Sequence, residues 1–105
     1  MTIEFQTPYG KIPEKLVSKI RNEILELSHI NKDISRAEVL LKVEETISPA
    51  DNKVCEIRLT GSGDDLLSHS RSVNFRKSAK EAINELKKML KQQAPSEEIF
   101  STVEV

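Results

Sequence analysis

Hydrophobic positions along the chain follow two spacings. Apolar and polar residues alternate in three stretches, as in a strand that buries one face: residues 2–7, 34–45 and 53–60. Residues 66–75 form a weaker predicted strand, in which serines alternate with larger side chains. Apolar residues instead recur every three or four positions in two stretches, as in an amphipathic helix: residues 13–31 and 78–93. The predicted order is β-α-β-β-β-α. Since each helix has one apolar stripe, we expect an α+β two-layer sandwich, a four-stranded sheet with both helices on one face.

The C-terminal helix has the clearest pattern. Ser78 and Glu81 have the S-x-x-E spacing of a capping box, which predicts that the helix begins at Ser78. Its predicted apolar stripe comprises Ala79, Ala82, Ile83, Leu86, Met89 and Leu90. In the strand before it, every second residue from Ser68 to Ser72 is a serine. Such small side chains fit a sheet face that a helix covers closely.

The same helix concentrates positive charge. Residues 76–93 include six basic and two acidic side chains, a formal charge of +4 in a chain whose net charge is −1. At about 100° per residue, Lys80, Lys87 and Lys91 form one stripe away from the apolar side, with Lys77 and Lys88 on its flanks. This pattern favours an anion-binding face, although many lysine-rich helices are simply solvated.

Composition limits the class of protein. A chain of 105 residues fits one domain, which we predict over residues 1–93, followed by a flexible acidic tail over 94–105. No apolar run is long enough to span a membrane, and the N-terminal residues do not resemble a signal peptide. The single Cys55 cannot form an internal disulfide, which fits a reducing, cytoplasmic location.

Catalytic and metal-binding patterns are weak. His29 and His69 lie on different predicted elements, and no cluster with metal-ligand spacing accompanies them. Cys55 alternates with Ile57 and is predicted to lie in the core. The Gly61-Ser62-Gly63 segment lies between two predicted strands, so it indicates a hairpin turn rather than a phosphate loop. We therefore expect no enzyme activity, cofactor or small-molecule substrate.

Three segments resemble the family of ribosome hibernation-promoting factors and protein Y. They are ISRAEVLLKVE (residues 34–44), NKVCEIRL (residues 52–59) and AINEL (residues 82–86). The resemblance covers residues 2–93 and implies a βαβββα domain that binds the small ribosomal subunit and idles ribosomes under stress. It implies that helix cations contact ribosomal RNA phosphates. The candidate residues are Lys15, Lys19, Arg21, Arg76, Lys77, Lys80, Lys87, Lys88 and Lys91.

The chain departs from the family pattern in its first helix. Glu23 and Glu26 stand where the family usually has basic residues, so ribosome binding is not the only hypothesis. The segment from Arg76 to Ala82 also resembles the basic start of the second helix in double-stranded RNA-binding domains, which recognise shape and phosphates. A third possibility is a protein-interaction module that uses the open sheet face or an exposed edge.

Overall fold

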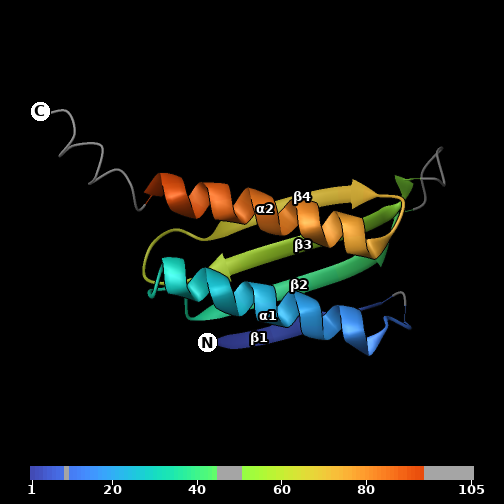
Figure 1. Ribbon diagram of the computed structural model, residues 1–105, viewed down its shortest axis with the longest axis horizontal. Coiled ribbons are helices and arrows are strands. Elements are labelled where there is room, and N and C mark those ends of the chain that lie inside the picture. Colours follow the sequence, from blue (N-terminus) through green and yellow to red (C-terminus); the bar gives the residue numbers. More distant parts are fainter. Residues whose placement is uncertain (9, 45–50, 94–105) are drawn as a thin grey trace, which may run out of the picture.

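Four strands form a single sheet in the computed structural model, in the spatial order β1-β2-β3-β4 (Figure 1). They are β1 (Thr2–Gln6), β2 (Arg36–Val43), β3 (Lys53–Thr60) and β4 (Leu66–Ser72). The structure describes residues 1–8, 10–44 and 51–93. The predicted tail, residues 94–105, lies outside the described residues.

The sheet is mixed. β1 pairs with β2 in parallel, Thr2 opposite Arg36, after a crossover through the first helix. The pairs β2–β3 and β3–β4 are antiparallel hairpin neighbours. The predicted strand between residues 66 and 75 ends earlier, at Ser72, because the chain turns there into the second helix.

Both helices lie on one face of this sheet, which confirms the predicted two-layer arrangement (Figure 1). They are α1 (Glu14–Ile30) and α2 (Phe75–Gln93). Both run in the same direction, so their N-termini lie at one end of the molecule and their C-termini at the other (Figure 1). Neither helix has the length and hydrophobicity that a membrane span requires, as judged over the described residues.

The core fills the space between the helices and the sheet. Alternate residues of β2 and β3 are buried there, among them Val39, Leu41 and Ile57. Ser68 and Ser72 of β4 are also buried, as predicted for a strand lying close beneath a helix. Ser70 Oγ donates a hydrogen bond of 2.6 Å to Glu81 Oε1, which links the edge of the sheet to α2.

The predicted capping box of the last helix, Ser78 with Glu81, is wrong. The helix begins at Phe75, and the Asn74 side-chain oxygen accepts a 2.8 Å hydrogen bond from the amide of Lys77. The Asn74 carbonyl also accepts the first helical hydrogen bond, from Ser78, so Asn74 is the N-cap. Ser78 is buried within the first turn, and its hydroxyl donates to the Phe75 carbonyl. Glu81, the other half of the predicted capping box, bonds to β4 instead.

The β3–β4 hairpin turn confirms the interpretation of Gly61-Ser62-Gly63. Gly61 lies against the loop that follows α1, where a β-carbon at this position would overlap the Asp33 carbonyl oxygen. The Ser35 amide bonds to the Thr60 carbonyl beside this contact. Glycine therefore allows the hairpin to pack directly on the start of β2.

Candidate nucleic-acid interface

The cations of α2 lie mainly on its exposed surface. Arg76, Lys77, Lys80, Lys88 and Lys91 are exposed, and Lys87 is half-buried. The buried side of the helix comprises Phe75, Ser78, Ala79, Ala82, Ile83, Leu86 and Leu90. The charged surface therefore does not compete with the core for the same positions.

The Ser70–Glu81 hydrogen bond shows which side of α2 faces the sheet edge. Glu81 points toward β4, the outermost strand on that side. At about 100° per residue, Arg76, Lys80 and Lys87 lie roughly 100–140° around the helix from Glu81. These three cations therefore lie on the side of α2 that faces α1. Lys77 and Lys88 are closer to Glu81 and lie toward the top of the helix.

A cation–aromatic contact gives the orientation of α1. The Arg21 guanidinium lies over the Phe5 ring, with its central carbon 5.4 Å from the ring centroid. Phe5 belongs to β1, the opposite edge strand. Lys19 lies about 160° around α1 from Arg21, and Lys15 is near Lys19, one turn earlier. Lys15 and Lys19 therefore face α2, whereas the structure separates Arg21 from the other candidate residues.

The two helices place their cations at matching heights. Lys15 and Arg76 are each the second residue of their helix, and Lys19 and Lys80 are each the sixth. Both helices start at the same end of the sheet (Figure 1), so these four positions fall in the first two turns of the helices, at that end. We call the region between the helices the interhelix surface. It comprises Lys15, Lys19, Glu23 and Glu26 of α1, and Arg76, Lys80, Lys87 and Lys91 of α2.

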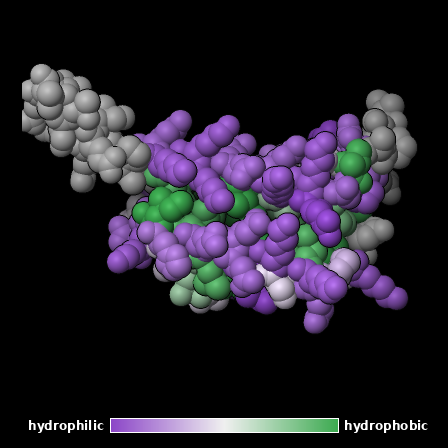
Figure 2. Space-filling view, in the orientation of Figure 1, coloured by the Kyte–Doolittle hydropathy of each residue, from purple (hydrophilic) through white to green (hydrophobic). Residues whose placement is uncertain are grey.

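Charge changes along the interhelix surface. Its N-terminal half contains only cations among these eight residues, and the positive ends of two helix dipoles add to them. In the other half, Glu26 is the thirteenth residue of α1 and is level with Lys87, the thirteenth of α2. Figure 2 shows two hydrophilic rows over the helices with hydrophobic side chains between them. An extended anion such as a phosphate backbone fits the N-terminal half best.

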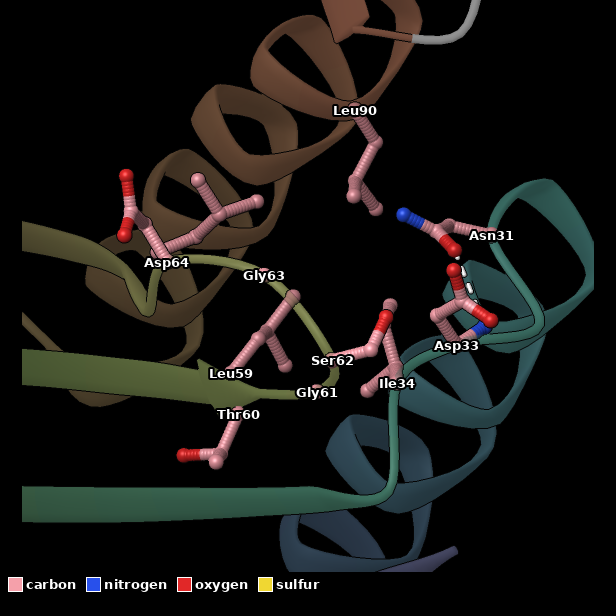
Figure 3. A pocket seen from close by; sticks show the side chains of 11 residues that line it. Asn31, Asp33, Ile34, Leu59, Thr60, Gly61, Ser62, Gly63, Asp64 and Leu90 are labelled. Carbon is pink, nitrogen blue, oxygen red and sulfur yellow. Dashed lines mark hydrogen bonds between the residues drawn. The ribbon is translucent and has the colours of Figure 1, made fainter.

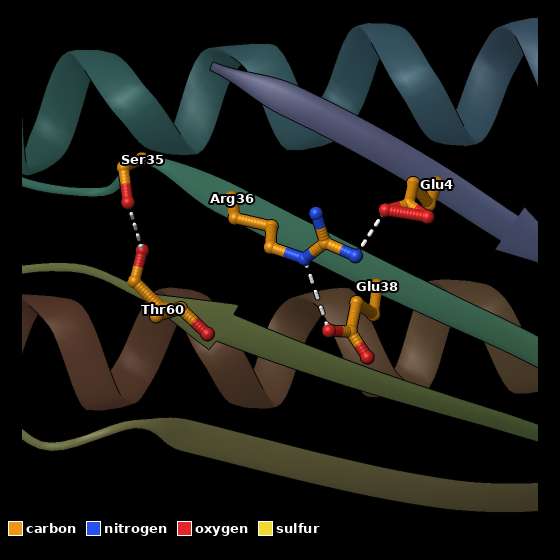
Figure 4. Close-up of polar contacts among 5 residues, drawn as sticks. All are labelled: Glu4, Ser35, Arg36, Glu38 and Thr60. Carbon is orange, nitrogen blue, oxygen red and sulfur yellow. Dashed lines mark hydrogen bonds and ion pairs between the residues drawn. The ribbon is translucent and has the colours of Figure 1, made fainter.

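The open face of the sheet has charges of both signs, and most of them are paired. Arg36 forms ion pairs with Glu4 and Glu38, and the hydrogen bond to Glu38 raises the pKa of Arg36 (Figure 4). Further pairs are Lys42–Glu56 at 3.5 Å, His69–Glu56 at 3.7 Å and Arg71–Glu44 at 2.9 Å. By contrast, no acidic group within residues 1–8, 10–44 and 51–93 forms an ion pair with a cation of the interhelix surface. The unpaired cations of the helices are therefore the better anion site.

Other chemical sites are poorly supported. Burial raises the pKa of the Cys55 thiol to about 12, with a smaller effect from the Glu56 charge, so the thiolate is strongly disfavoured. No group of three potential metal-ligating side chains occurs in the described part of the chain. A cavity of about 290 Å³ opens between the C-terminal ends of the helices and the β3–β4 turn (Figure 3). Asp33 and Asp64 lie at this cavity, so it would repel an anion.

Comparisons with known proteins show what this fold resembles. A ribosomal subunit interface protein from Coxiella burnetii has a similar structure, with a TM-score of 0.74 and 14% sequence identity, covering 89% of this chain and 97% of that one. The N-terminal domain of Thermus thermophilus Protein Y has a TM-score of 0.68 and 12% identity, covering 87% of this chain and 93% of that domain. No family model and no curated protein sequence matches. The comparisons confirm the predicted resemblance in its fold.

Proposed function

We propose that this protein binds the small ribosomal subunit through the interhelix surface and idles ribosomes by occupying the channel for tRNA and mRNA. The main support is that Lys15, Lys19, Arg76 and Lys80 occupy matching positions in the first two turns of two helices that start at the same end of the sheet. Two solved structures with this fold are a ribosomal subunit interface protein and the N-terminal domain of Protein Y. The ribosomal RNA backbone supplies the anion that the cations require.

The cations are expected to contribute unequally to the binding of ribosomal RNA. Lys15, Lys19, Arg76 and Lys80 contact phosphates in the N-terminal half, while Lys87 and Lys91 extend this contact along α2. Lys77 and Lys88 lie toward the top of α2, farther from α1, and contribute less. Arg21 contributes least, because it lies over Phe5 on the far side of α1.

Reversing three cations of α2 tests the proposal directly. We expect a variant with Lys80, Lys87 and Lys91 changed to Glu to keep its fold and to lose association with small ribosomal subunits in sedimentation. In a titration with purified subunits, each lost phosphate contact lowers the salt dependence by about one unit of slope. Circular dichroism of the variant tests whether the fold is retained.

A matched control changes the same net charge elsewhere. Lys32, Lys53 and Arg58 lie outside the interhelix surface, and their triple change to Glu is expected to leave ribosome binding nearly unchanged. Equal losses in both triple variants would point to a general charge effect. A triple variant of α2 that binds with the original salt slope would show that its lysines are merely solvated.

Double-stranded RNA is the second candidate ligand. Its support is the position of Arg76, Lys77 and Lys80 in the first two turns of α2, just after the Asn74 cap. Competition separates the two ligands. If the ribosome is the ligand, a low concentration of ribosomal subunits should displace the protein from duplex RNA. Displacing it from subunits should take a far higher concentration of duplex RNA. The reverse order would favour a duplex-binding function.

A further inference from the structure

β4 is an edge strand with an apolar surface of its own. Its seven residues pair with β3 on one side only in the described sheet, and the strand contains neither proline nor lysine, two residues that often protect sheet edges. Leu67 is 55% exposed and Val73, just after the strand, is 51% exposed. Leu67 lies at an alternate position of β4 that faces away from the helices, and Val73 directly follows the last strand residue, Ser72. The edge therefore offers backbone hydrogen-bonding groups and exposed apolar side chains together.

We propose that β4 pairs with β4 of a second copy of this chain, antiparallel and centred on Ser70. In this register, with the pairing extended one residue beyond Ser72, Leu67 of one copy lies opposite Val73 of the other, and the twofold symmetry repeats the contact. The two most exposed large apolar side chains in the described residues then cover each other. Two four-stranded sheets become one continuous sheet, with all helices on the same face.

The helix layer supports the same register independently. Because Ser70 Oγ donates to Glu81 Oε1, Glu81 lies near the level of the proposed symmetry axis. α2 runs antiparallel to β4, so Lys77 and Glu85 lie one turn before and one turn after that level (Figure 1). A twofold axis there places Lys77 of one copy opposite Glu85 of the other. Both residues are exposed, and neither forms an ion pair with another described residue of its own chain.

The other edge of the sheet is less suited to self-pairing. β1 has five residues, and Glu4 lies at its centre, so pairing about that point would bring two carboxylates face to face. Glu4 is already held by Arg36, and Phe5 is covered by Arg21. Only β4 combines an apolar match in the sheet with a charge match in the helices.

Sedimentation velocity over a range of protein concentrations tests the pairing. We expect the full chain to shift from monomer to dimer as its concentration rises. Leu67→Lys should sediment as a monomer throughout, because it buries an unpaired charge at the strand contact. The matched control is Leu25→Lys on α1, since Leu25 is also an exposed leucine, at 40%, and should dimerise as the unmodified chain does.

A charge exchange tests the register itself. Lys77→Glu and Glu85→Lys should each weaken dimerisation, because each places like charges opposite one another. The double variant restores opposite charges and should recover most of the lost dimer affinity. If the two substitutions acted independently, their losses of dimer affinity would instead add. Circular dichroism of each variant separates helix stability from association.

Several outcomes would overturn the pairing. They are a chain that stays monomeric up to its solubility limit, equal effects of Leu67→Lys and Leu25→Lys, and a double charge variant that dimerises less than either single variant. Dimerisation that survives Leu67→Lys would assign the interface to another surface. Ribosome binding is measured separately, and Leu67→Lys should leave it intact because Leu67 faces away from the helices.

Discussion

The two helices share one core but differ in what they contribute to it and in what they expose. Among the side chains whose burial the structure describes, α2 buries seven, whereas α1 buries three, Ile20, Ile24 and Leu27. α2 has six basic and two acidic residues, whereas α1 has three basic and three acidic ones, so their formal charges are +4 and 0 with His29 neutral. The helix that anchors the fold is therefore also the one that makes the surface basic, and α1 adds cations only near its start.

The largest expected effect tests the difference in burial. Leu86→Ala in α2 should lower the free energy of unfolding by about 2–5 kcal/mol, because Leu86 is fully buried and the change leaves a cavity. Val17→Ala in α1 should cost clearly less, since Val17 is only half-buried. Chemical denaturation of both variants measures this. Equal costs would mean that the helices anchor the core equally.

The next prediction removes the difference in charge. Changing Glu23 and Glu26 to Lys makes the C-terminal half of the interhelix surface as basic as the N-terminal half. We expect the affinity for ribosomal subunits to rise about tenfold, with a steeper salt dependence, because two repulsive groups become phosphate contacts. The control changes Glu4 and Glu38, on the open sheet face, to Lys. A gain of equal size in the control would show that net charge matters more than position.

The smallest effect concerns how α2 begins. Asn74→Ala should lower the free energy of unfolding by about 1 kcal/mol, because the Lys77 amide loses its side-chain acceptor. Ser78→Ala should cost less, since its hydroxyl only adds a bond to a carbonyl within the same turn. Thermal unfolding of both variants compares them. If Ser78→Ala lost more stability than Asn74→Ala, Ser78 would be the N-cap, as the sequence predicted.

Much of the fold follows from local patterns. The alternation in β2 and β3 identified the buried residues Val39, Leu41 and Ile57, and the stripe of α2 identified Leu86 and Leu90. The sequence did not predict the direction of β1 relative to β2. Parallel pairing depends on the path of the chain through α1, and the alternation of apolar and polar residues does not report that path. The cap of α2 was misplaced at Ser78, because the S-x-x-E spacing also occurs inside this helix, where Asn74 already caps the first turn.

The candidate site was predictable in composition but not in arrangement. The angles around α2 correctly separated Lys80, Lys87 and Lys91 from the apolar stripe. Grouping Arg21 with Lys15 and Lys19 ignored their positions around α1, which the contact between Arg21 and Phe5 makes plain. The matching heights of the cations on the two helices depend on tertiary packing, so no local pattern contains them.

The parallel pairing of β1 has a consequence for the order in which this protein folds. Thr2 must pair with Arg36 across a long chain segment that contains α1. By contrast, Thr60 and Leu66 lie in strands joined by one short turn. Closing the longer loop costs more chain entropy, so the β2–β3–β4 hairpins can nucleate with α2 before β1 docks. β1 is also short and lies at the edge, so it should open first and exchange its amide hydrogens fastest among the strands. The hairpins and α2 thus form the early-folding unit, onto which the N-terminal strand adds last.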